Sequence, residues 1–277
     1  MSYKTILTVT GPGFGDGDLK LTAGLCEEVK AHFSVLVIAL AAPPPIGTVR
    51  NLSLAWLEEQ EEDMRRLDAR TAAVSVLLAG NTLSADVISD YAELGQGDEA
   101  IGRRARYADL TVLGPEVLAG ATLKEKVIEG ALFSSGKPLL LVPEGSSPTL
   151  KPKRVLVAWD SRIEASRAVR ESLEMLIGAE DVRLVLVDPV QGEEYHGEEP
   201  GADAAAYLAR HGVKLTIDRL PRMNRSVADA LRQHAQDTAT ELMVMGAYGH
   251  SRFRERLFGG VTKSMLDKSS VPILMAR

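Results

Sequence analysis

Apolar residues in the second half of the chain recur at two different spacings. Short runs rich in Val, Leu and Ile predict buried strands, and segments with apolar residues every three or four positions predict helices. In the segment 163–177, Ala165, Ala168 and Leu176 fall on one helical face. The predicted strands are 153–160, 182–188, 214–219, 241–245 and 271–275, and the predicted helices are 163–177, 202–211, 226–238 and 261–268.

The first half repeats this order of elements. Its predicted strands are 4–11, 34–40, 74–79, 109–113 and 137–142, and its predicted helices are 19–31, 52–70 and 84–107. Strands that alternate with helices favour parallel pairing, with right-handed crossovers that place helices on both faces of the sheet. The sequence therefore predicts an α/β protein with two tandem, doubly wound, parallel five-stranded sheets.

A short segment rich in proline and serine, 145–152, separates the two copies of the pattern. It predicts a linker between a first domain of residues 1–144 and a second domain of residues 153–277. In an open parallel sheet, ligands bind beyond the carboxyl ends of the strands. In the second domain this rule selects Asp160, the pair Val187 and Asp188, and the segment after residue 245.

Composition and charge narrow the class of protein. The 277 residues are 25% charged, and no apolar run approaches the roughly 18 residues of a membrane span. Cys26 is the only cysteine and the N-terminal sequence does not look like a signal peptide, so we expect a cytoplasmic protein. Residues 1–150 hold 13 Lys and Arg against 20 Asp and Glu, whereas residues 151–277 hold 19 against 18. The acidic first half argues against nucleic-acid binding, which needs a basic surface.

Glycines surround the segment after the predicted strand 241–245. Gly246 and Gly249 follow this strand, and Gly259 and Gly260 precede the predicted helix 261–268. Glycine lets a backbone approach a ligand closely, and peptide N–H groups at a helix start favour anions. The segment between these glycines is basic, with His250, Arg252, Arg254 and Arg256. Together these features predict a site for a phosphate-bearing ligand.

With these residues in place, the chain resembles a tandem universal stress protein, two copies of that domain in one polypeptide. Gly246, Gly249 and Gly259 match the family's Gly-x2-Gly-x9-Gly motif, and Asp160 stands at the end of the first strand. The next family position is usually Ser or Thr, but here it is Gly260. The resemblance implies a Rossmann-like fold of the adenine nucleotide alpha hydrolase type and a site for ATP, with or without Mg²⁺.

The resemblance also implies roles for individual residues. Asp160 would contact the ribose, Ala158 the base, and the Val187 backbone the adenine. Met245 and Gly246 would line the base and ribose, and the phosphates would be wrapped by Gly249, Gly259, Gly260 and Val261. Gly260 removes a hydroxyl donor, which Thr262 would partly replace, so weaker binding is expected. One hydrogen bond to a charged acceptor is worth about 1.5–3 kcal/mol.

The first half departs from the same motif. Gly11 stands where the second half has Asp160, Val117 replaces the second glycine, and counting back from Pro138 places Glu125 at the position of Gly259. We therefore expect no nucleotide in the first domain and a structural or dimer-like role. The glycine-rich segment 11–17 lacks the Lys-Ser/Thr ending of a P-loop and is interpreted as a flexible loop.

Several of these residues also have simpler interpretations. Asp160 would serve equally as a helix N-cap, and the arginines of 250–256 as a solvated loop. Trp159 is interpreted as core packing, Cys26 as buried filler, and the acidic segment 193–199 as solvated rather than metal-binding.

The function predicted first is a cytoplasmic stress-response protein that binds adenine nucleotide in its second domain as a signal or structural ligand. It would be at most a slow ATPase, because no general base is evident. It would form a pseudo-dimer within the chain and homo-oligomers, without membrane or nucleic-acid partners. One alternative is a nucleotide-free interaction module, and another is a phosphotransferase or hydrolase.

Overall fold

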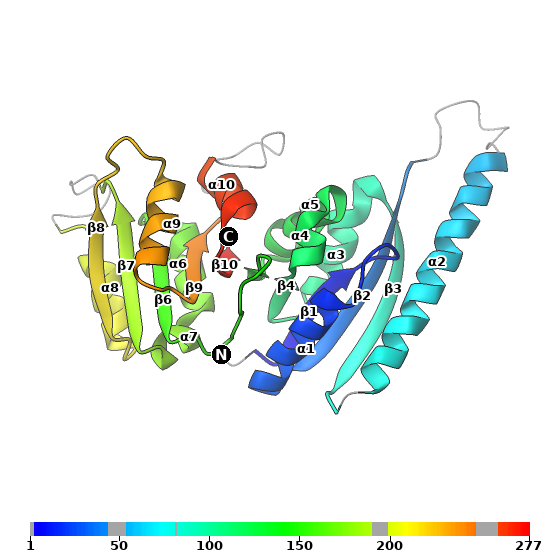
Figure 1. Ribbon diagram of the computed structural model, residues 1–277, viewed down its shortest axis with the longest axis horizontal. Helices are drawn as coiled ribbons and strands as arrows, with labels where there is room; N and C mark the ends of the chain where they lie inside the picture. Colours follow the sequence, from blue (N-terminus) through cyan, green and yellow to red (C-terminus); the bar gives the residue numbers. More distant parts are fainter. Residues whose placement is uncertain (1–2, 44–53, 81, 190–198, 248–259) are drawn as a thin grey trace. The chain divides into compact units, whose positions relative to one another are not determined.

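The computed structural model describes residues 3–43, 54–80, 82–189, 199–247 and 260–277 (Figure 1). Residue contacts divide this part of the chain into two compact units. The first unit comprises residues 3–137, and the second unit runs from residue 138 to residue 277. Each unit has a sheet dominated by parallel strands that are joined by helices, so the predicted α/β class is confirmed.

In the first unit the strand order is β3-β2-β1-β4, and the described pairs are parallel. Its strands are β1 (Thr5–Thr10), β2 (His32–Ala41), β3 (Ala85–Glu93) and β4 (Leu110–Leu113). Its helices are α1 (Gly17–Val29), α2 (Leu54–Ala79), α3 (Gly97–Ala105), α4 (Pro115–Ala119) and α5 (Ala121–Glu129), with a 3₁₀ turn at Leu94–Gln96 and a π-helical turn at Gly130–Ser135. The core lies where β1, β2 and β4 are buried on both faces, as their near-continuous apolar runs predict.

In the second unit the strand order is β5-β10-β9-β6-β7-β8. Its strands are β5 (Leu139–Leu141), β6 (Arg154–Ala158), β7 (Asp181–Val187), β8 (Leu215–Leu220), β9 (Leu242–Gly246) and β10 (Ile273–Ala276). Its helices are α6 (Ile163–Glu171), α7 (Leu173–Gly178), α8 (Ala202–Arg210), α9 (Val227–Asp237) and α10 (Gly260–Lys268). Figure 1 shows α9 and α10 on the near face of this sheet, and α6 and α8 behind it.

The strand β5 differs from the predicted pattern. It pairs antiparallel with β10, with Leu141 opposite Ile273 and Leu139 opposite Met275. Contacts accordingly assign it to the second unit, and the division between units lies at Lys137 and Pro138, ahead of the predicted linker at 145–152. The predicted domain limits of 1–144 and 153–277 stay a prediction.

The third strand predicted for the first half is wrong. Residues 74–79 are the end of the helix α2, and the third strand is β3 at 85–93, inside the predicted helix 84–107. Leu67, Val74 and Leu78 are buried on one side of α2, whereas Val76 is 76% exposed. This is helical spacing, which the two β-branched residues Val74 and Val76 obscured.

Candidate functional site

A cavity of about 290 Å³ lies in the second unit, at the carboxyl ends of three strands. β6 and β7 pair up to Ala158 and Val185, and the Trp159 N–H donates to the Val185 carbonyl at 2.9 Å. β7 then runs on to Val187, beyond the end of β6. The cavity is closed by the end of β9 and by the first turn of α10, which is where open parallel sheets bind ligands.

Eight of the ten residues predicted for the ligand site line this one cavity. They are Ala158, Asp160, Val187, Met245, Gly246, Gly260, Val261 and Thr262. The other two, Gly249 and Gly259, lie outside the described residues, as do His250 and the three arginines predicted beside them. Residues from four separate segments of the chain thus come together, while their contact with a ligand stays a prediction.

Asp160 stands at the mouth of the cavity with a basic neighbour. Its Oδ1 accepts the Arg162 backbone N–H at 3.1 Å, and its Oδ2 lies 3.7 Å from the Arg162 Nε. The N-cap of α6 is Arg162, so the alternative that Asp160 itself is the N-cap is wrong. The Asp160 side chain is 59% exposed, which leaves its carboxylate accessible as an acceptor for a polar ligand.

Five residues of the cavity were not predicted from the sequence. They are Trp159, Arg162, Val185, Val227 and Leu231. Trp159 is half-buried and lines the cavity, so its interpretation as core packing is wrong. Val227 and Leu231 are four residues apart on α9, and this spacing was the available signal that both face the sheet.

The two described glycines of the predicted site, Gly246 and Gly260, differ in their surroundings. A Cβ on Gly246 would lie 2.5 Å from the Ala165 nitrogen and 2.6 Å from the Glu164 carbonyl carbon, both of them backbone atoms of α6. Gly246 is therefore required by helix packing. A Cβ on Gly260 would meet no described atom within 4 Å. Among the described residues, none sterically excludes a side chain at position 260.

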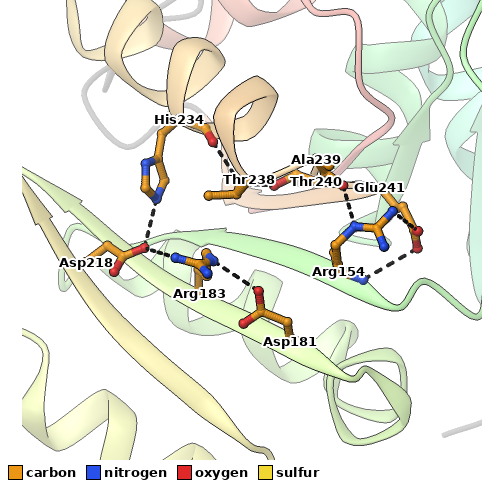
Figure 2. Close-up of polar contacts among 9 residues, drawn as sticks. All are labelled: Arg154, Asp181, Arg183, Asp218, His234, Thr238, Ala239, Thr240 and Glu241. Atoms are coloured by element: carbon orange, nitrogen blue, oxygen red, sulfur yellow. Dashed lines mark hydrogen bonds and ion pairs between the residues drawn. The ribbon is translucent and has the colours of Figure 1, made fainter.

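A polar network fastens α9, which forms one wall of the cavity, to the sheet (Figure 2). His234 Nε2 lies 2.8 Å from Asp218 Oδ2, and Arg183 Nη1 lies 3.2 Å from the same oxygen. The Arg183 Nε also donates to Asp181 Oδ2 at 3.1 Å. Asp218 lies on β8 in register with Val185, which lines the cavity, so this network lies beside the cavity and connects α9 to β8 and β7.

In the first unit, the residues after β4 contact the chain's own carboxylates. The Glu116 and Val117 N–H groups both donate to the Asp18 carboxylate at 3.0 Å, and Glu116 Oε1 accepts the Gly17 N–H at 3.0 Å. Asp18 is buried, and burial raises its pKa above the ordinary value of 3.8. The segment 11–17, predicted to be flexible, is thereby held by polar contacts, including those from Arg70 to Asp16 and to the Gly15 carbonyl.

The position predicted for Glu125 is wrong. Glu125 lies within α5, and the residue directly before that helix is Gly120, as Gly259 directly precedes α10. The π-helical turn Gly130–Ser135 adds residues between α5 and β5, so counting back from Pro138 shifted the alignment. A carboxylate at the helix start is therefore not what distinguishes the first unit from the second.

Other predictions concern residues away from the cavity. Cys26 is fully buried as predicted, and burial raises the pKa of its thiol to about 12.

Within the described ranges there is no group of three or more potential metal ligands. Most of the acidic segment 193–199 falls outside these ranges. In the described part of the chain, no helix is both long enough and apolar enough to span a bilayer. The cytoplasmic location stays a prediction.

Comparisons with known proteins find similarity to universal stress proteins. The model of the universal stress protein family matches residues 151–277. A universal stress protein of Synechocystis sp. is 26% identical over 264 residues, which cover 90% of this chain and 87% of the relative. A solved universal stress protein from Archaeoglobus fulgidus aligns with a TM-score of 0.65 at 14% identity, covering 100% of this chain and 97% of that one. A functionally unknown protein from Pseudomonas aeruginosa aligns with a TM-score of 0.54 at 16% identity, covering 99% and 92%. At such identities the two structures show a shared fold.

Proposed function

We propose that the second unit, in which residues 151–277 match the universal stress protein family model, binds an adenine nucleotide, ATP, in the cavity between β6, β7, β9 and α10. The observation that carries the proposal is the convergence of eight predicted residues on one cavity. The nucleotide would act as a regulatory or structural ligand in a stress-response protein.

The walls of the cavity suit a flat apolar base. Ala158, Val187, Leu231 and Met245 supply aliphatic and thioether surface, which is typical of pockets that bury a ring system. Val187 extends past the last β6–β7 pair, at Ala158 and Val185, so its backbone lies at a strand edge beside the cavity. A base would be oriented there by backbone donors and acceptors.

The mouth of the cavity suits a ribose and phosphates. The exposed Asp160 carboxylate can accept hydrogen bonds from sugar hydroxyls. α10 begins at Gly260, and the first N–H groups of a helix have no partner within it. These groups and the positive end of the helix dipole favour a phosphate, with Mg²⁺ as an optional companion.

Rapid hydrolysis is not part of the proposal. Asp160 is the only carboxylate among the described residues of the cavity, and Arg162 is its ion-pair partner. A general base needs an available carboxylate or imidazole within reach of the attacking water. We infer at most a slow ATPase, and the oligomeric state stays a prediction.

Calorimetric titration with ATP and Mg²⁺ tests the proposal. Asp160→Ala is expected to weaken binding about tenfold to a hundredfold, because a hydrogen-bonding carboxylate is lost. Asp203→Ala is the matched control, since Asp203 is an exposed carboxylate on α8, outside the cavity, and this variant should bind as the wild type does.

Two results would contradict the proposal in different ways. Absence of heat with the wild type at high micromolar ATP would favour the nucleotide-free interaction module. Equal affinity of Asp160→Ala and the wild type would show that ATP binds elsewhere. Rapid turnover of a defined substrate that is lost in Asp160→Ala would instead support an enzyme.

A further inference from the structure

The first unit contains a cavity of about 280 Å³ at the edge of its sheet, which the proposed function does not use. β3 is the last strand in the order β3-β2-β1-β4, and Figure 1 shows α2 beside it. The cavity lies at the carboxyl ends of β2 and β3, between the start of α2 and the helix α3. It is lined by residues 41–42, 56, 60, 90–93, 96, 100 and 103. It therefore lies away from β1 and β4, and none of the ligand residues predicted from the sequence lines it.

The residues of β3 that line this cavity face two different helices. Successive side chains of a strand point to opposite faces of the sheet. Asp90 Oδ2 lies 3.6 Å from Arg103 Nη2 of α3, so Asp90 is on the α3 face and Tyr91 is on the α2 face. Burial raises the pKa of the Tyr91 hydroxyl, and the nearby charges of Asp63 and Glu59 on α2 raise it further. The cavity thus wraps around the edge of β3 from one face to the other.

Two aromatic residues belong to this cavity. Trp56 and Gln60 are four residues apart on α2 and both line it, as expected of neighbours on one helical face. Glu59 and Asp63, which act on the Tyr91 hydroxyl, each lie three residues further along the same side of the helix. The Tyr91 hydroxyl is therefore near the side of α2 that carries Trp56, and both aromatic residues are half-buried. Together they offer a ligand the negative faces of two π systems.

The charges around this cavity are mostly negative. Four carboxylates lie in or beside it against two guanidinium groups, a net of −2: Glu59, Asp63, Asp90 and Glu93 against Arg66 and Arg103. Both guanidinium groups are engaged, Arg66 with Asp63 and Arg103 with Asp90. Among the described residues, Glu59 and Glu93 are in no ion pair. The local field therefore favours a cation.

The lining suits an organic cation better than a metal ion. Within the described residues, no group of three or more potential metal ligands occurs. A primary ammonium group loses its water only where carboxylates accept its N–H protons, and Asp90 is already paired with Arg103. A quaternary ammonium group has no N–H to satisfy, and aromatic faces attract it by cation–π interaction. The combination of aromatic residues with a diffuse negative charge therefore matches a quaternary ammonium group.

From this lining, we propose that the first unit binds a small quaternary ammonium cation at the edge of β3. Its alkylated nitrogen contacts the rings of Trp56 and Tyr91, and the Glu93 carboxylate balances its charge. This proposal goes beyond nucleotide binding in the second unit and does not depend on it.

Choline tests the proposal, and the matched probe is its uncharged analogue, in which carbon replaces the nitrogen. The chain has two tryptophans, Trp56 and Trp159, so the indole N–H signals of the full-length ¹⁵N-labelled protein report the two units separately. Choline chloride replaces sodium chloride at constant ionic strength, which keeps the screening of charges unchanged. We expect saturable shifts of the Trp56 indole and of the Tyr91 amide with choline, and at least tenfold weaker binding of the uncharged analogue.

Substitutions at the cavity separate the aromatic contact from the charge, with the Tyr91 amide as the signal. Trp56→Leu keeps an apolar side chain without a π face and should weaken choline binding about tenfold, whereas Trp56→Phe should stay within about threefold of the wild type. Glu93→Gln removes an unpaired carboxylate and should weaken binding about threefold. Glu27→Gln is the matched control, because Glu27 is an exposed carboxylate on α1, outside the cavity, and should bind as the wild type does.

Three results would overturn the proposal. Millimolar choline would shift no signal of the cavity in the folded wild type, or choline and its uncharged analogue would bind equally well. In the third, Trp56→Leu and Trp56→Phe, both shown to be folded by their urea midpoints, would bind choline with the same affinity. Because Trp159 lines the cavity of the second unit and has its own indole signal, none of these results bears on ATP binding there.

Discussion

The two units differ where the chain leaves the sheet, after β4 in the first unit and at the end of β9 in the second. In the first unit, Gly114 packs against the Asp18 carboxylate, which accepts the N–H groups of the following turn. In the second unit, Gly246 packs against backbone atoms of Glu164 and Ala165 in α6 and against the Cβ of Glu164. The first unit thus satisfies the N–H groups of Glu116 and Val117 with its own anion. The start of the later helix lines a cavity in both units, α5 in the first and α10 in the second.

The largest expected effect comes from filling these two glycine positions. Gly246→Ala places a methyl group against backbone atoms of α6 at 2.5–2.6 Å, and such overpacking costs about 1–3 kcal/mol of unfolding free energy or more. For Gly114→Ala, the three atoms nearest to the new Cβ all belong to the side chain of Asp18, which can rotate away at the loss of its two hydrogen bonds. Urea denaturation of both variants measures the two costs.

A double-mutant cycle sharpens this comparison. Asp18→Ala already removes the side chain that Gly114→Ala would meet, so the second substitution should add little in that background. Glu164→Ala leaves the backbone and the Cβ of residue 164 in place, so Gly246→Ala should keep its full cost there. Additive costs in the first pair, or relief in the second, would show that the two glycines do not differ in this way.

A smaller effect is expected at Gly260, the first residue of α10. A side chain fits there without meeting a described atom, so Gly260→Ser can restore a hydroxyl donor to phosphate. We expect about tenfold tighter ATP binding, the lower end of a hydrogen bond to a charged group. Gly260→Ala is the control, because it adds the Cβ without the hydroxyl. Calorimetry that finds the same affinity for the serine and alanine variants would exclude a hydroxyl contact.

The second unit was largely predictable from the sequence. Its strands are short apolar runs between helices of clear amphipathic spacing, as in Val227 and Leu231 of α9, so periodicity and connection lengths identify the elements. Strand ends and helix starts in a parallel sheet meet at one edge, which is why residues as distant as Ala158 and Thr262 could be placed at one cavity. Trp159 and Arg162 were missed because orientation at a strand end depends on the turn that follows.

The first unit was less predictable for two physical reasons. The run at 74–76 has β-branched residues but helical burial, and single-sequence patterns do not separate these reliably in short apolar segments. The π-helical turn at Gly130–Ser135 adds residues without a sequence signal, which displaced the alignment at Glu125. The pairing of β5 with β10 is likewise a tertiary choice, since both are short apolar strands.

The smallest expected effect is a difference in pH dependence between one carboxylate of each unit. Burial raises the pKa of Asp18, so the folded protein retains a proton on this group at pH values where the unfolded chain has lost it. Its contribution to stability is therefore most favourable below pH 3.8 and declines as the pH rises through the raised pKa. Asp229 is the opposite case, because the Ser226 hydroxyl donates to its carboxylate at 2.5 Å and, with Arg232, lowers its pKa.

Asn at each position removes the titration and keeps the shape, so the two variants test the signs directly. Relative to the wild type, Asp18→Asn should become more stable as the pH rises from about 3 to about 7, and Asp229→Asn should become less stable over the same range. Urea midpoints measured side by side give both differences. Parallel trends would mean that the two backbone N–H donors outweigh burial and lower the pKa of Asp18.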